Sequence, residues 1–276
     1  MKTTILILAI VAFAAAVPKP GQLHYRNLFK HPVKEIQVKP SPRIIGGQEA
    51  EPHSIPYQVL LEVYSADGGW YCGGSLISEN YILTAAHCNV DGTEAHITLG
   101  AHKQTEAEDT QVKVVSTELT VHEDYDDELI INDIGVIKLP EPVVLTDAIQ
   151  VVALPTKADA SNDYVGTTAR ISGWGLTDGL GDTLSEVLNY VDVDVITNED
   201  CEEAFGDLPE TNICTSGDQD TGSCNGDSGG PLVAEDKQIG VVSFGIMFCL
   251  PGYPSGFTRL TSFLDWIEAN TDVQIQ

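Results

Sequence analysis

Short runs of apolar and β-branched residues recur from residue 44 onward, separated by glycine, proline and aspartate. They cover residues 57–63, 81–86, 96–100, 112–121, 133–139, 167–175, 190–195 and 238–245. In YVDVDV, Val191, Val193 and Val195 alternate with Asp192 and Asp194, so the valines share one face of a strand and the aspartates the other. Strands this short, interrupted this regularly, predict an all-β sandwich or barrel.

Only the C-terminal segment TSFLDWIEANTD, residues 261–272, has a helical pattern. Ser262 is a residue type that caps helix N-termini. Phe263, Trp266 and Ile267 fall on one stripe of the helix that follows. The length of 276 residues allows one large domain or two small ones.

The N-terminus has the order of a secretory signal peptide. Lys2 precedes an apolar run that ends in three alanines, which predicts cleavage after Ala16. The run is too short to span a bilayer comfortably. We therefore expect residues 1–16 to be removed and the protein to be secreted to the extracellular space.

Six cysteines in a secreted chain indicate three disulfides and leave their pairing open. No two of them have the CxxC spacing of a metal site.

Charge divides the chain into two parts. Residues 1–43 hold seven basic residues and one acid, a net charge of +6, whereas residues 44–276 hold seven basic residues and 40 acids, a net charge of −33. A body this acidic disfavours nucleic acid and anionic membranes as partners. The basic part ends in SPRIIGG, residues 41–47, where we predict a processing boundary.

Three separated segments carry residues for nucleophilic catalysis. They are LTAAHC with His87, INDIGVIKL with Asp133, and GDSGGPL with Ser228. A serine hydroxyl is a weak nucleophile until an oriented base takes its proton. Each segment alone has an ordinary structural explanation, but the three together, in this order, point to a catalytic triad.

With these motifs, residues 44–276 resemble chymotrypsin/trypsin-family serine proteases. The resemblance implies two packed six-stranded antiparallel β-barrels, a boundary near residue 150 and a C-terminal helix at about 262–272. It implies that Ser228 attacks the scissile carbonyl, that His87 transfers the proton, and that Asp133 orients His87.

The resemblance also assigns the surroundings of the triad. The backbone N–H groups of Gly226 and Ser228 would form the oxyanion hole. Ser243 would support Asp133, and the strand Ser243–Gly245 would pair with the substrate backbone. Phe244 stands where the family usually has tryptophan.

Activation follows from the same resemblance. Cleavage after Arg43 would free Ile44, whose ammonium would pair with the buried carboxylate of Asp227 and order the loop around the nucleophile. Residues 17–43 would then be an activation propeptide, which would be released because it has no cysteine. The implied disulfides are Cys72–Cys88, Cys201–Cys214 and Cys224–Cys249.

Specificity in the family depends on the substrate pocket. The resemblance implies that Gly222 lies at the floor of this pocket, Gly245 at its entrance and Ser255 in its wall. Without an acid at the floor, the pocket is expected to take large apolar side chains. The pattern resembles insect chymotrypsins and brachyurin-type collagenolytic proteases, and elastase-like or broad collagenolytic specificity is the alternative.

No cofactor and no metal site are expected, since segment 101–111 lacks acids at both ends of the family's calcium loop. The expected partners are protein and peptide substrates, an activating trypsin-like protease and protein inhibitors, and the expected state is a monomer. A digestive role fits the short propeptide better than a regulatory cascade. The alternative to an enzyme is a non-catalytic protease homologue that acts as a binding cofactor. Such a homologue would be recognised by the loss of a triad residue.

Overall fold

The computed structural model describes residues 27–28, 31–32, 44–176, 183–246 and 249–276. The predicted signal peptide and most of the predicted propeptide lie outside these residues. Within the described part, no helix is both long and apolar enough to cross a membrane.

The first of two antiparallel sheets contains β2 (His31–Pro32), β4 (Gln58–Ser65), β5 (Gly68–Leu76), β6 (Tyr81–Thr84), β7 (Glu94–Leu99), β8 (Val112–Ser116), β9 (Leu119–Val121) and β10 (Gly135–Lys138). Its order is β8-β7-β4-β5-β6-β10-β9, with β2 beside β5. β8 and β9 lie at opposite ends of this order, yet only two residues separate them in the chain. Residues 112–121 therefore serve both edges as one bent strand and give a six-stranded barrel.

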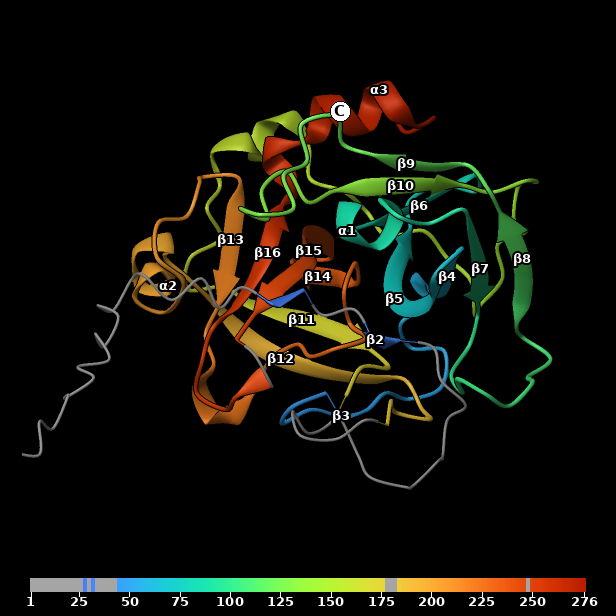
Figure 1. Cartoon of the computed structure of the whole chain (residues 1–276), viewed down its shortest axis with the longest axis horizontal. Helices are drawn as coiled ribbons and strands as arrows, with labels where there is room; N and C mark the ends of the chain where they lie inside the picture. The colour runs from blue at the N-terminus through green and yellow to red at the C-terminus, as the bar shows by residue number, and fades with distance from the viewer. Residues whose placement is uncertain (1–26, 29–30, 33–43, 177–182, 247–248) are drawn as a thin grey trace, which may run out of the picture.

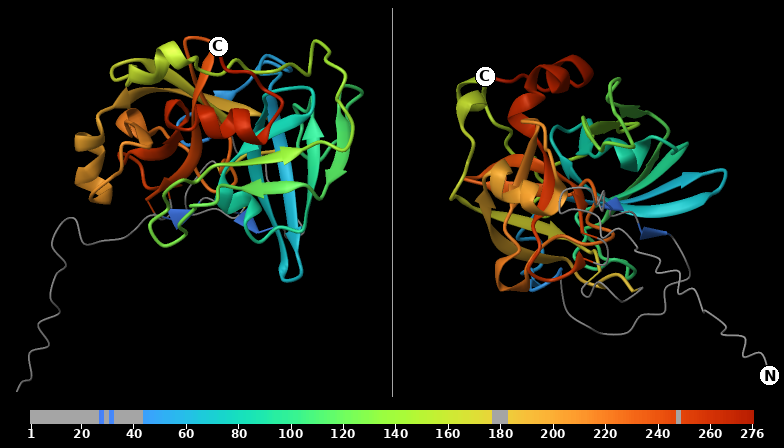
Figure 2. Two further views of the ribbon diagram at one scale, coloured as in Figure 1. Left: turned by 90° about the horizontal axis from the view of Figure 1, so that it is seen from above. Right: turned by 60° about the vertical axis from the view of Figure 1, so that its left-hand side comes forward.

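The second sheet contains β1 (Asn27–Leu28), β3 (Gln48–Glu49), β11 (Thr168–Gly173), β12 (Asn189–Ile196), β13 (Asn212–Thr215), β14 (Pro231–Ala234), β15 (Lys237–Gly245) and β16 (Ser255–Arg259). β11 to β16 form a closed ring of six, because β15 pairs with both β14 and β16. β1 pairs with β15, and β3 pairs with β12. The predicted fold of two six-stranded antiparallel barrels is confirmed, and Figures 1 and 2 show the barrels side by side.

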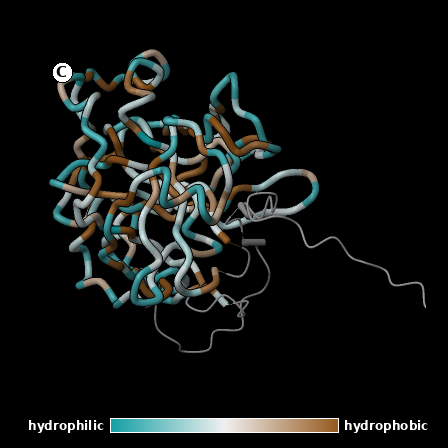
Figure 3. Tube along the Cα trace, turned by 90° about the vertical axis from the view of Figure 1, so that its left-hand side faces the viewer, coloured by the Kyte–Doolittle hydropathy of each residue, from teal (hydrophilic) through white to brown (hydrophobic). Residues whose placement is uncertain are grey.

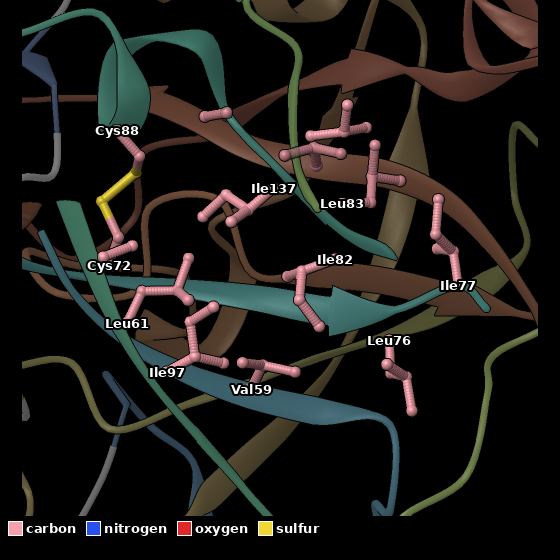
Figure 4. Packing of buried hydrophobic residues seen from close by; sticks show 14 of the residues in the cluster. Val59, Leu61, Cys72, Leu76, Ile77, Ile82, Leu83, Cys88, Ile97 and Ile137 are labelled. Atoms are coloured by element: carbon pink, nitrogen blue, oxygen red, sulfur yellow. A yellow bond between two sulfur atoms is a disulfide. The ribbon is translucent and has the colours of Figure 1, made fainter. Parts of the chain in front are cut away.

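Each barrel has its own apolar core. In β12 the three valines of the alternating run are buried and the two aspartates are exposed, as the period-two pattern predicts. In the first barrel, Leu61, Ile82 and Ile97 pack near the disulfide between Cys72 and Cys88 (Figure 4). Apolar stretches run through the interior, while the outer turns are mostly hydrophilic (Figure 3).

The described part has three α-helices, α1 (Ala86–Asn89), α2 (Asn198–Phe205) and α3 (Leu264–Asn270). α3 confirms the C-terminal helix, but the predicted cap was wrong. Ser262 ends a preceding 3₁₀ turn, and Phe263 occupies the cap position without a side-chain hydrogen bond.

The sequence pattern missed α2 because its only buried residues are Cys201 and Phe205, too few for an apolar stripe. Its start is nevertheless capped, since the Thr197 hydroxyl accepts a hydrogen bond from the Asp200 N–H at 3.0 Å.

Candidate active site

The three predicted catalytic side chains meet between the two barrels. His87 lies in α1, directly after β6, and Asp133 lies in the loop before β10, so both belong to the first barrel. Ser228 lies in the turn before β14 of the second barrel. All three residues are buried, with relative exposures of 0% for His87, 1% for Asp133 and 0% for Ser228.

Hydrogen bonds connect these side chains in series. His87 Nε2 lies 2.8 Å from Ser228 Oγ, and His87 Nδ1 lies 2.7 Å from Asp133 Oδ2. The His87 backbone N–H donates to Asp133 Oδ1 at 2.9 Å. Asp133 therefore fixes both the backbone and the ring of His87, and the free ring nitrogen can take a proton from the Ser228 hydroxyl.

The second barrel holds Asp133 from the other side. The Ser243 hydroxyl donates to Asp133 Oδ2 at 2.5 Å, and the Thr258 hydroxyl donates to the Asp133 carbonyl at 2.6 Å. Burial by itself raises the pKa of Asp133, but the charge and hydrogen bonds of His87 and the Ser243 hydroxyl outweigh burial, so the pKa is lowered. Asp133 therefore stays ionised beside the imidazole.

The turn before the nucleophile depends on Gly226. Its φ of +97° is a conformation that L side chains rarely adopt, and an added Cβ would lie 2.6 Å from Leu184 Cδ2. Asp227 follows and is 0% exposed. Its carboxylate accepts hydrogen bonds from the backbone N–H groups of Gly175 at 2.9 Å and Cys224 at 3.0 Å.

Burial raises the pKa of Asp227 to about 7, against the opposing effect of the two N–H donors. Ile44 is also 0% exposed and lies in the core of the second barrel. Ile45 forms a β-bridge with Gly222. The residues after Arg43 therefore lie beside the predicted pocket floor, while Arg43 itself lies outside the described residues.

A cavity lies at the predicted pocket. Its lining residues are Ile45, Thr221, Gly222, Ser223, Ile246, Cys249, Leu250, Tyr253, Pro254 and Ser255, none of them charged. The Ser255 hydroxyl accepts from the Ser223 N–H at 3.3 Å and lies 3.0 Å from where a Cβ on Gly222 would be. Asp218 and Asp220 are exposed.

The sequence profile of the trypsin family matches residues 44–267. The chain belongs to the trypsin family. A chymotrypsin of Phaedon cochleariae is 40% identical over 278 residues, covering 100% of both chains. A brachyurin of Leptuca pugilator is 46% identical over 231 residues, covering 83% of this chain and 99% of the relative.

A solved structure titled HL collagenase has a TM-score of 0.77 and 37% identity, covering 84% of this chain and 100% of that one. These similarities show that the chain is a serine endopeptidase, an enzyme that acts on proteins.

The protease contains the three disulfides that the resemblance implies, Cys72–Cys88, Cys201–Cys214 and Cys224–Cys249. The first joins β5 to α1, the helix that carries His87. The third joins the loop before the nucleophile, which contains Cys224, to the cavity wall, where Cys249 lies. No described cysteine is free.

In segment 101–111, where the family's calcium loop would fall, Glu108 bonds to the backbone of its own loop. Glu108 Oε2 accepts hydrogen bonds from the backbone N–H groups of His102 at 2.7 Å and Lys103 at 2.8 Å, and from Gln111 Nε2 at 3.2 Å. Burial raises the pKa of Glu108, but these donors outweigh burial, so the pKa is lowered.

Phe244 is fully buried and packs edge-to-face on Phe205, with 5.1 Å between ring centroids. It is not among the described residues that line the cavity, so the change from the family's tryptophan affects packing behind the strand. Gly245 is the last residue of β15 and is buried. Sequence reasoning missed Thr258, which lies outside the three catalytic motifs, and gave no role to Ser223, although it follows Gly222 directly.

Proposed function

We propose that the protease is secreted as an inactive precursor and cleaves peptide bonds by an acyl-enzyme mechanism. Ser228 Oγ attacks the scissile carbonyl carbon while His87 Nε2 takes its proton, and the backbone N–H groups of Gly226 and Ser228 stabilise the oxyanion. His87 then returns the proton to the leaving amine. Water attacks the acyl-enzyme by the same route and releases the acid. The hydrogen-bonded series from Asp133 through His87 to Ser228 carries this proposal.

Activation requires a cut after Arg43. The new ammonium of Ile44 would pair with Asp227, whose buried carboxylate accepts from the N–H groups of Gly175 and Cys224 and has no cation beside it among the described residues. A charge buried without a counter-ion is costly, and pairing it would order the turn that contains Gly226. The activator would be a protease that cleaves after arginine.

The pocket favours large apolar residues before the scissile bond. Its described lining offers hydroxyls and apolar groups but no carboxylate. Burying an unpaired Lys or Arg there would cost several kcal/mol, on the order of the penalty for breaking a buried ion pair. Burying a Phe, Tyr or Leu side chain gains about 1.5–3 kcal/mol.

A broader specificity is the second candidate. It is favoured by the similarity to relatives named brachyurin and collagenase. It is also favoured by the Ser255 hydroxyl, which lies close to Gly222 and would narrow the floor of the substrate pocket. Release into a digestive fluid would suit a domain with only seven basic residues, because few sites are then open to trypsins.

The nucleophile gives the direct test. Ser228→Ala should reduce kcat on a peptide substrate by several orders of magnitude while the circular dichroism spectrum and Tm stay unchanged. Ser161→Ala is the matched control, because Ser161 is exposed and lies outside the site. A Ser228→Ala enzyme with the control's rate would exclude the proposed mechanism.

A further inference from the structure

The precursor segment β1 lies along the strand proposed to bind substrate. Asn27 pairs with Gly245 and Leu28 with Phe244, antiparallel to β15. The residue of β15 that precedes Phe244, Ser243, donates a hydrogen bond from its hydroxyl to Asp133. An extended peptide that adds a strand to a sheet edge gains backbone hydrogen bonds in the same way. β1 therefore occupies the edge beside the aspartate of the triad.

The second precursor segment, β2, lies along an edge of the other barrel. His31 pairs with Tyr71 and Pro32 with Trp70, antiparallel to β5. Two residues beyond Tyr71, the Gly73 N–H donates to the Ser228 carbonyl at 2.6 Å. β2 therefore occupies the edge beside the nucleophile.

The sequence allows only a short crossing between these two edges. Two residues separate Leu28 from His31, and an extended chain covers at most about 10 Å over three steps. The catalytic groups lie between the same two barrels, and the short blue strands lie along that junction (Figures 1 and 2). His87 and Ser228 are each 0% exposed in the precursor chain, although a substrate has to reach Ser228 Oγ.

We propose that β1 and β2 occupy the substrate-binding edges on either side of the catalytic groups, so that the propeptide acts as a tethered, substrate-like ligand. The inference rests on the proposed function, because it takes β15 as the strand that pairs with substrate. It adds a second block on the precursor, independent of the Ile44 ammonium. The charges favour it, since residues 17–43 hold six basic residues and one acid, a net +5, whereas residues 44–276 carry a net −33.

The tether decides when the ligand leaves. Eleven residues separate Pro32 from Ile44, and a short linker of this kind gives an effective concentration on the order of millimolar. A cut after Arg43 removes the tether, and the segment then dissociates by dilution. One cleavage thus frees both Ile44 and the substrate edges.

The first test uses a synthetic peptide of residues 17–43 as a competitive inhibitor of the activated enzyme. Asn27→Pro with Leu28→Pro removes the donors of β1, and should weaken inhibition at least about tenfold. Gln22→Pro with Leu23→Pro is the matched control outside both strands, and should inhibit like the parent peptide. Equal inhibition by the two proline peptides would overturn the proposal.

The site of cleavage is a second readout on the same peptide. The enzyme should cut first after Phe29, the aromatic residue that the sequence places between the paired segments. A first cut outside residues 28–31, located by mass spectrometry, would show that the substrate-like register is wrong.

Hydrogen exchange tests the precursor itself, with Ser228→Ala in every protein to prevent self-digestion. Alternate residues of an antiparallel strand donate to a given neighbour, so one of the two adjacent amides of Phe244 and Gly245 faces β1. That amide should exchange at least about tenfold faster in the Asn27→Pro/Leu28→Pro precursor than in the control precursor. Unchanged protection would overturn the proposal. The proposed function is tested separately, by the activity of the activated enzyme with Ser228 intact on a small substrate. That activity does not depend on whether the propeptide occupies the two edges.

Discussion

Replacing Asp227 with asparagine should change how the stability of the precursor depends on pH. Before the cut after Arg43, Asp227 is fully buried and burial raises its pKa to about 7, from a usual 3.8. The folded precursor therefore prefers the neutral carboxyl. The contribution of Asp227 to stability is fully present below pH about 4 and is lost as the pH rises through about 7.

The size of the loss follows from the two pKa values. One pKa unit corresponds to about 1.4 kcal/mol, so the difference between 3.8 and about 7 amounts to about 4 kcal/mol. Asp227→Asn abolishes this titration, but leaves one of the N–H donors of Gly175 and Cys224 without an acceptor. That loss costs about 1–3 kcal/mol at every pH. The pH dependence is therefore the informative quantity, and the absolute stability is not.

Urea unfolding from pH 4 to pH 8, in a Ser228→Ala background, measures this quantity. The free energy of unfolding of Asp227→Asn, minus that of the parent, should rise by about 4 kcal/mol across this range. Asp67→Asn is the control, because it removes the same charge from an exposed position. A difference that stays constant with pH would refute the reasoning. After cleavage the Ile44 ammonium should keep Asp227 ionised, and the rise should disappear.

Three further predictions concern activation, specificity and metals. Arg43→Gln should keep the precursor inactive in the presence of trypsin, and N-terminal sequencing of active wild-type enzyme should begin at Ile44; another N-terminus would contradict the activation step. On matched peptides, kcat/KM after Phe, Tyr or Leu should exceed that after Arg or Lys at least about tenfold, or about 1.4 kcal/mol. Equal cleavage after Arg would show that an acid reaches the floor at Gly222. A chelator should leave Tm unchanged, because Glu108 is already satisfied by donors of its own loop, and a fall of several degrees would show that a bound cation stabilises the fold.

The barrels were predictable where strands carry their own pattern. The run 112–121 was predicted as one strand, and it joins both edges of the first barrel although the structure breaks it into β8 and β9. β5 was missed because GGWYCGGSL has glycines where apolar side chains mark other strands. Its neighbours fill that space instead, since a Cβ on Gly74 would lie 2.8 Å from Ile82 Cγ2.

The candidate site could be predicted only where a residue lies in a distinctive motif. His87, Asp133 and Ser228 do, and the structure brings them into one hydrogen-bonded series. Thr258 supports Asp133 from a distance of 125 residues in sequence, which no local pattern records. The pairing of Asn27 and Leu28 with β15 was equally hidden, because two-residue strands have no measurable period.

The division of the proposed triad between two barrels makes activity a sensitive measure of how the barrels pack on each other. His87 and Asp133 move with one barrel and Ser228 with the other, and a misplacement of about 1 Å can cost about a hundredfold in rate. A small displacement of one barrel relative to the other would therefore abolish activity while both hydrophobic cores stay intact. We expect heat, pressure or mild denaturant to switch off hydrolysis before any spectroscopic sign of unfolding. A crosslink across the junction should make the loss of activity and the unfolding of the protein occur under the same conditions.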